Sequence, residues 1–189
     1  MMDLLLQYID SCILALLERR EYMRILKLLF LFILNGILWF CAHMYISKLF
    51  LRINDQHYID GPLKLRSFNF EDKGTVYQKY FKVKSWKDKM PEGSQFFTNT
   101  YNKRELKNNS PETINEFLVE VNRAEITHWG ILFTLPIVLL FNPRWTYKIH
   151  SIYALAANIP FIIIQRYNRP RFEAIQQRHN SKQFKEDKV

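Results

Sequence analysis

Glu125 and His128 stand three residues apart, at the point where a hydrophobic run of the chain begins. At about 100° per residue, a helix would carry both side chains on one face. A buried, unpaired charge is costly, or its pKa shifts until the group is neutral. A chain that accepts this cost either pairs the two groups within its core or uses them for acid–base chemistry, and the residues alone leave both interpretations open.

The residues before this pair predict the helix that carries it. Ser110 suits the N-cap, Pro111 the first helical position and Glu112 the first turn. Because Glu125 and His128 continue the apolar stripe that follows, the helix is expected to present them on its apolar face. The stripe consists of Ile114, Phe117, Leu118 and Val121.

Three arginines around a proline form a second polar group, which follows the last apolar run of the chain. Guanidinium groups bind carboxylates and phosphates through paired hydrogen bonds, so this group is a candidate anion-binding site. The alternative is a positively charged stop at the end of a membrane helix. The group comprises Gln165, Arg166, Asn168, Arg169 and Arg171.

Two apolar runs, residues 126–141 and 149–164, are joined by a short turn at residues 142–145. A short connection forces two consecutive helices to run antiparallel. The start of the first run and the end of the second therefore lie on one side, which brings the arginines near Glu125 and His128. Each run contains a proline and is short for a full span. We therefore expect either a transmembrane or a re-entrant hairpin.

The clearest transmembrane helix is predicted at residues 25–46, an apolar run bracketed by Lys27 and Lys48. A cleaved signal peptide is the alternative, but the run is long for one, and no small-x-small cleavage site follows it. Residues 1–24 contain an apolar stretch that is too short to cross a bilayer. They predict an interfacial amphipathic helix, or a helix docked on the protein's own membrane segment.

Between the membrane segments, residues 47–122 are expected to form a polar cap. Phe81 and Val83 alternate with lysines, which predicts a half-exposed strand. Trp86 and Lys87 lie in a basic, aromatic stretch that is typical of a membrane surface. A solvated basic strand is the alternative for this stretch.

Together these elements predict one membrane-integrated domain that is mainly α-helical. An N-terminal transmembrane helix precedes a small α+β cap, a helical membrane hairpin at residues 123–171 and a polar tail at residues 172–189. The net charge of +9 is attributed to positive-inside bias and anionic lipids instead of nucleic acid. Most of the 27 Lys and Arg residues fall in the cap and the tail, so we expect both, with the candidate site, to face the cytoplasm.

Four blocks of residues occur in an order that resembles the glycosyl-4,4'-diaponeurosporenoate acyltransferase family of bacterial carotenoid synthesis. The resemblance covers roughly residues 24–172, and its last block is long and distinctive. The chain departs from the family by a helix before Arg24 and by its polar tail. The blocks are Ser67-Phe68-Asn69-Phe70-Glu71-x-x-Gly74, Trp86-Lys87-x-Lys89, Arg123-Ala124-Glu125-x-x-His128-Trp129 and Asn158-Ile159-Pro160-Phe161-Ile162-Ile163-x-Gln165-Arg166-Tyr167-Asn168-Arg169-Pro170-Arg171.

The resemblance implies an enzyme of the bacterial cell membrane that esterifies a sugar hydroxyl of a glycosylated carotenoid acid, or of a related glycolipid, with a fatty acyl group. The acyl donor is expected as a co-substrate, with no cofactor. We expect His128 to act as general base and Glu125 to orient its imidazole, as a carboxylate does in serine-hydrolase triads. Direct transfer is preferred over an acyl-enzyme because the sequence has no Gly-x-Ser-x-Gly elbow. The expected substrate-binding residues are Trp86, Lys87, Gln165, Arg166, Asn168, Arg169 and Arg171.

Two interpretations from other classes of protein are open. Glu-x-x-His also occurs in helical di-iron sites, which would make the protein a metal-dependent membrane enzyme. Those sites need a second such motif, and the sequence has none, so no metal is expected. The other alternative is a non-catalytic membrane scaffold of a pigment-synthesis complex, in which Glu125 and His128 could be replaced freely.

Overall fold

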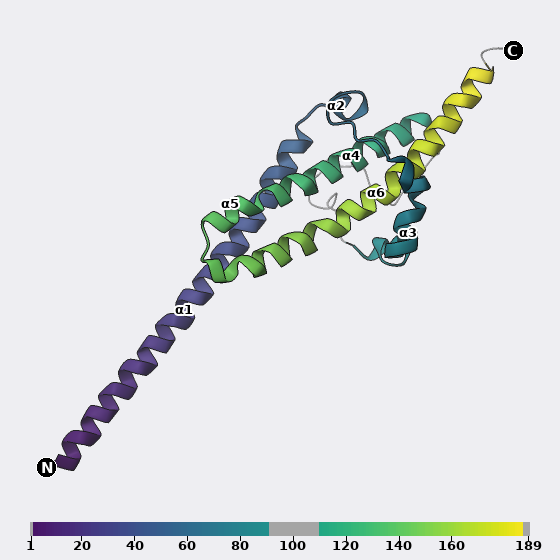
Figure 1. Ribbon diagram of the computed structural model, residues 1–189. Helices are drawn as coiled ribbons and strands as arrows, with labels where there is room; N and C mark the ends of the chain where they lie inside the picture. The colour runs from purple at the N-terminus through teal and green to yellow at the C-terminus, as the bar shows by residue number, and fades with distance from the viewer. Residues whose placement is uncertain (1, 91–109, 187–189) are drawn as a thin grey trace. The chain divides into compact units, whose positions relative to one another are not determined.

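The computed structural model describes residues 2–90 and 110–186, and this part of the chain contains helices and connecting segments but no strand (Figure 1). The α-helices are α1 (Met2–Leu51), α2 (Gln56–Ile59), α3 (Thr75–Phe81), α4 (Pro111–Phe133), α5 (Leu135–Leu140) and α6 (Tyr147–Glu186). The short 3-10 helices are η1 (Asn69–Gly74), η2 (Val83–Ser85), η3 (Lys87–Lys89) and η5 (Arg144–Thr146).

The contacts divide the chain into two compact units, Met1–Met44 and Tyr45–Val189. The described part of the first unit is a stretch of α1. The sequence predicted separate helices at residues 1–24 and 25–46, but α1 runs through both without interruption. No proline or glycine stands between them, and the Glu, Arg and Met residues at the junction favour a helix.

Three helical stretches of the described chain are long and apolar enough to cross a membrane, namely Glu18–Leu51, Pro111–Leu140 and Arg144–Ser181. Large apolar side chains along them are exposed, Phe32 and Leu140 among them. Such exposure is expected where lipid instead of protein covers a helix. The structure thus supports the prediction of a mainly helical membrane protein.

The helices α4 and α6 form the antiparallel hairpin that the short connection predicted (Figure 1). The Ser110 hydroxyl caps α4 by accepting a hydrogen bond from the Thr113 amide at 3.3 Å, and Pro111 begins the helix, which confirms the predicted start. In the contacting pairs, residue numbers fall along α4 as they rise along α6. These pairs are His128–Asn158, Glu125–Arg166, Asn122–Arg169 and Phe117–Phe172.

The strand predicted around Phe81 and Val83 is wrong, because α3 ends at Phe81 and η2 begins at Val83. Lys82 between them has a φ of 48°, a left-handed conformation that ends the helix and turns the chain. The Trp86 indole then donates a hydrogen bond to the Phe81 carbonyl oxygen at 2.8 Å. Val83 is buried whereas Phe81 is 49% exposed, so the alternating residues do not share a buried face. The described part of the cap is therefore helical instead of α+β.

The 3-10 helix η1 lies directly against α6 at Gly74. Gly74 has a φ of 81°, in the left-handed region that L side chains rarely adopt. A Cβ atom at this position would lie 2.5 Å from the Tyr167 carbonyl oxygen and 3.3 Å from the Tyr167 ring. Both the backbone conformation and the available space therefore require glycine where the cap meets the hairpin.

Replacing Gly74 with alanine should lower the stability of the protein by about 1–3 kcal/mol from the left-handed conformation alone. Thermal unfolding of the purified protein in detergent would measure the change. Gly36→Ala is the matched control, because no atom lies within 4 Å of the added Cβ and alanine favours a helix. Equal unfolding temperatures for the two variants would contradict this account of the contact between the cap and the hairpin.

Candidate active site

The Glu125 carboxylate is fully buried, and two arginines of α6 bind it. Its Oε1 accepts hydrogen bonds from Arg166 Nε at 2.8 Å and from the Trp129 indole at 3.4 Å, while Oε2 accepts one from Arg169. Arg169 is itself buried and donates from Nε to the Asn122 side-chain oxygen at 2.9 Å. The hairpin therefore brings two of the three predicted arginines onto the predicted carboxylate.

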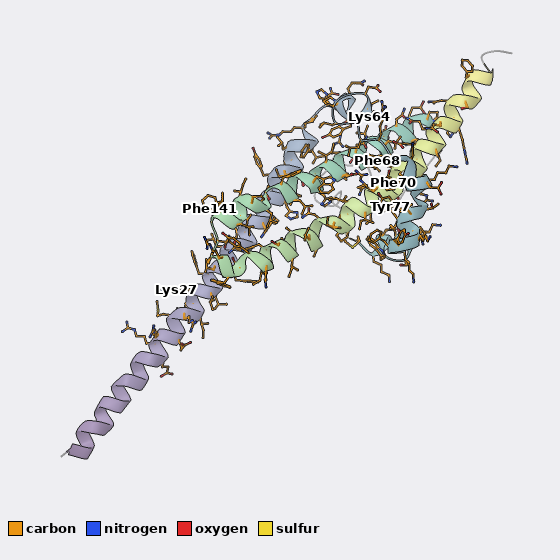
Figure 2. The ribbon with its side chains drawn as sticks, in the orientation of Figure 1. Lys27, Lys64, Phe68, Phe70, Tyr77 and Phe141 are labelled. Carbon is orange, nitrogen blue, oxygen red and sulfur yellow. The ribbon has the colours of Figure 1, made fainter. Side chains whose placement is uncertain are left out.

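A second buried carboxylate belongs to Glu71 in η1. It binds Arg166, one of the two arginines that bind Glu125. Its Oε1 accepts hydrogen bonds from Arg166 Nη1 at 3.2 Å and from the Tyr77 hydroxyl at 2.6 Å, and its Oε2 accepts one from the Phe68 amide at 2.7 Å. Burial, together with the hydrogen bond to Glu71, raises the pKa of Tyr77 to about 12, so the hydroxyl stays protonated and donates. Figure 2 labels Phe68 and Tyr77, and the Phe68 ring centroid lies 5.0 Å from the Arg166 guanidinium.

We refer to Glu71, Glu125, Arg166 and Arg169 as the carboxylate–arginine cluster. Its two carboxylates and two guanidinium groups balance in charge. Taking charges out of water is costly, and their attraction offsets that cost only when hydrogen bonds satisfy the groups. Glu71 was not among the predicted site residues, although it stands in the first of the four blocks, and that block was the available signal.

One turn beyond Glu125 on α4, His128 contacts Asn158 of α6. The Nδ1 atom of His128 lies 2.9 Å from the Asn158 side-chain oxygen. The Asn158 amide nitrogen donates to the Ala154 carbonyl oxygen at 2.9 Å, which fixes the orientation of the amide. The amide oxygen can only accept, so Nδ1 carries a proton, and in a neutral imidazole the lone pair is then on Nε2. Phe161 stacks on the imidazole, with ring centroids 4.7 Å apart.

Two further predicted residues, Gln165 and Asn168, lie on α6 next to the arginines, and both are buried. The Gln165 side-chain oxygen has no hydrogen-bond partner among the described residues. A buried polar atom without a partner is unusual in a folded protein. Both residues belong to the predicted polar group that contains the arginines, and all of them lie on α6.

The predicted residues Lys87 and Arg171 meet at another place, the ring of Tyr167. The Lys87 Nζ atom lies 5.8 Å from the ring centroid, and the Arg171 guanidinium lies 4.8 Å from it. The Trp86 indole instead donates its hydrogen bond within the cap, to the Phe81 carbonyl oxygen. The predicted substrate-binding residues therefore fall into separate groups instead of forming one pocket wall.

Metal coordination was the chemistry of one alternative. Among the residues whose side chains the structure describes, no group of three or more His, Cys, Asp or Glu is placed to hold a metal ion. Both oxygens of Glu125 accept hydrogen bonds from arginine, and Nδ1 of His128 faces an amide oxygen. The Glu-x-x-His motif thus takes part in two different hydrogen-bond networks.

Apolar helices long enough to cross a membrane, a buried carboxylate–arginine cluster and a neighbouring histidine–asparagine pair define a helical membrane protein with a candidate acid–base site. The family model of glycosyl-4,4'-diaponeurosporenoate acyltransferase matches residues 62–178, a range that contains the cluster and the pair. The chain belongs to this family of acyltransferases.

Individual relatives agree with this assignment. Proteins named glycosyl-4,4'-diaponeurosporenoate acyltransferase from Staphylococcus aureus strains bovine RF122 / ET3-1 and USA300 are each 39% identical over 135 residues, which cover 70% of this chain and 80% of the relative. The protein of that name from strain MRSA252 is 38% identical over the same length. No solved structure matches the chain. The resemblance drawn from the four blocks is confirmed, and the protein is an acyl-transferring enzyme.

Replacing Glu125 with glutamine should destabilise the protein by about 3–5 kcal/mol, because the buried Arg169 guanidinium would lose its carboxylate partner and Arg166 would keep only Glu71. Thermal unfolding in detergent at neutral pH would measure this loss. Glu116→Gln, an exposed carboxylate on the same helix, is the control and should change stability by about 0.5 kcal/mol or less. If both variants unfold at the same temperature, Glu125 does not compensate the charge of the arginines.

Proposed function

We propose that this protein is a bacterial membrane enzyme that transfers a fatty acyl group to a sugar hydroxyl of a glycosylated carotenoid acid or a related glycolipid. The observation that carries the proposal is the His128–Asn158 pair, which lies within the range matched by the family. The name of the Staphylococcus aureus relatives gives glycosyl-4,4'-diaponeurosporenoate as their acceptor. The three apolar helical stretches support a location in the membrane.

In the proposed reaction, His128 acts as general base toward the sugar hydroxyl. Its Nε2 accepts the hydroxyl proton as the oxygen attacks the acyl carbonyl carbon. Asn158 accepts a hydrogen bond from Nδ1–H, so it keeps the imidazole in the tautomer with a basic Nε2. The ester bond forms, the bond from the acyl carbon to the carrier breaks, and the proton leaves with the carrier.

Glu125 receives a different part in this proposal from the one that the sequence suggested. Its hydrogen bonds to Arg166 and Arg169 support a role in holding the two guanidinium groups, while Asn158 takes the position beside the imidazole. Glu125, which binds both arginines, lies one turn of α4 from His128. In this proposal the guanidinium N–H groups would stabilise negative charge that develops on the acyl oxygen, since preorganised donors act strongly in a water-poor site.

The arginine contacts also weigh on the metal-dependent alternative. A metal ligand must offer its lone pairs to the ion, but the Glu125 oxygens already accept hydrogen bonds from two cations. Two guanidinium charges at that carboxylate would also repel a divalent cation. These contacts favour acyl transfer by acid–base catalysis.

His128→Gln should lower acylation by about 10²- to 10⁴-fold, because glutamine keeps a similar size and hydrogen-bonding ability but cannot act as a base. The variant is expected to be made and inserted normally. Cells that express it should therefore accumulate the unacylated glycolipid, which mass spectrometry of extracted lipids would detect.

Two variants accompany this measurement. His57→Gln changes an exposed histidine of α2 and should leave acylation unchanged. Asn158→Ala removes the group that fixes the tautomer and should reduce acylation by less than His128→Gln does. Near-normal acylation by His128→Gln at matched protein levels would support the non-catalytic scaffold instead.

The proposed orientation places the cap, the candidate site and the tail in the cytoplasm, because most Lys and Arg residues lie there. In a chain whose Cys12 and Cys41 are replaced with serine, a single cysteine introduced beside Arg144 should react with an impermeant reagent added to intact cells. A cysteine beside Lys87 should react only after the cells are opened. The reverse pattern would require an acyl donor outside the cytoplasm.

A further inference from the structure

Two cations from distant parts of the chain lie beside one buried tyrosine ring. Tyr167 of α6 is 2% exposed. The Arg171 Nη1 atom donates a hydrogen bond to the Tyr167 hydroxyl at 2.6 Å, and the Arg171 guanidinium lies 4.8 Å from the ring centroid. Lys87 of η3 places its Nζ atom 5.8 Å from the same centroid. We call Lys87 and Arg171 the Tyr167 cation pair.

The two cations differ from the neighbouring arginines in their lack of strong acidic partners. Arg166 and Arg169 each bind a buried carboxylate. Within the described residues, the carboxylate nearest to Lys87 is that of Asp88, 3.8 Å away and 79% exposed, and Arg171 has no carboxylate partner. Exposed ion pairs of this kind contribute little. Among the described residues, no buried carboxylate balances the two positive charges of the Tyr167 cation pair.

The geometry of this pair suits a phosphate group. An arginine offers planar, paired donors, and a lysine adds a compact charge, which is a common combination for phosphate. Both side chains are half-buried, so their attraction for an anion is screened by water less than at a fully exposed surface. The Tyr167 ring and hydroxyl hold the Arg171 guanidinium in place, which reduces the entropy lost when a ligand binds.

The distance from the candidate base decides which phosphate-bearing donor fits. Arg171 lies thirteen residues beyond Asn158 on α6, which corresponds to a rise of about 20 Å along the helix axis at 1.5 Å per residue. An acyl phosphate joins its phosphate directly to the acyl carbon and cannot reach both places. The phosphate and ester groups of a phospholipid are separated by only a few bonds. A phosphopantetheine thioester has an extended arm between its phosphate and its acyl carbon.

We propose that the Tyr167 cation pair binds the phosphate of a phosphopantetheine-linked acyl thioester, which is the acyl donor of the reaction proposed above. This inference rests on the proposed function. The sugar oxygen forms an ester bond with the acyl carbon, and the carbon–sulfur bond breaks. His128 receives the hydroxyl proton and passes it to the departing thiolate, so the products are the ester and a free thiol.

The test compares two synthetic donors that differ only in the phosphate, acyl-phosphopantetheine and acyl-pantetheine. The purified protein in vesicles of uncharged lipid would receive glycosyl-4,4'-diaponeurosporenoate as acceptor, and ester formation would be measured. The wild type should use the phosphorylated donor with a kcat/KM about 10- to 100-fold higher, as expected for a hydrogen-bonded charged group. Lys87→Gln and Arg171→Gln should reduce this preference mainly through KM, and Arg171→Lys should retain part of it.

The controls keep failure of this inference separate from failure of the proposed function. Lys79→Gln removes a lysine that lies 5.5 Å from the exposed Tyr80 ring, and Arg178→Gln removes an exposed arginine of α6, so both should retain the preference. His128→Gln should slow both donors equally. Loss of activity with both donors in His128→Gln, together with no phosphate preference in the wild type, would overturn the donor site while supporting the function.

Two natural sources carry this phosphate, coenzyme A and acyl carrier protein. A side-by-side assay with acyl-coenzyme A and acyl-loaded carrier protein would show which donor the wild type uses with the higher kcat/KM. The variants Lys87→Gln and Arg171→Gln should weaken the use of that donor. A membrane headgroup is the competing ligand. If the variants lose activity only in vesicles with anionic lipid, and equally for phosphorylated and unphosphorylated donors, the pair binds lipid and the proposal is wrong.

Discussion

The buried contact between Glu125 of α4 and two arginines of α6 is the constraint on which the rest of the site depends. Burying the Arg169 guanidinium without a carboxylate would be costly, and Glu125 supplies that partner. The contact fixes the register of the hairpin, because a shift of one residue along α6 would rotate both guanidinium groups away by about 100°. Arg166 also binds Glu71, so the same charge balance attaches η1 of the cap to the hairpin.

Along α6, residues of the cluster lie between two places to which we assign different parts of the proposed reaction. On one side, His128 and Asn158 form a neutral pair whose hydrogen bonds determine which imidazole nitrogen is basic. On the other side, Lys87 and Arg171 meet at Tyr167, where no buried carboxylate of the described residues binds them. An electrically balanced cluster between them holds α4 and α6 together without neutralising the pair of cations. An acyl donor with a phosphate at one end and a reactive carbon at the other would lie along the hairpin.

The apolar helices explain why so much polarity gathers at one end of the hairpin. Lipid covers the exposed apolar side chains of a membrane helix but offers no partner for a buried polar group. The polar residues of α4 and α6 therefore face each other, as Asn122 and Arg169 do. At 1.5 Å per residue, α6 is about 60 Å long, roughly twice the hydrocarbon thickness. The hydrocarbon core can therefore cover only the apolar half of α6, and the half that contains the arginines extends beyond it.

The sequence by itself determined the features that local patterns encode. Ser110 and Pro111 marked the start of α4, the short turn required an antiparallel hairpin, and four blocks of residues indicated the family. Only the tertiary structure decided which side chains pair, since Glu71 meets Arg166 across 95 positions and His128 meets Asn158 across 30. The alternation at Phe81 suggested a strand, but a hydrogen bond from Trp86 and the left-handed Lys82 produced a helical turn. Spacing along a chain specifies which residues share a face, whereas hydrogen-bond partners depend on which distant face packs against it.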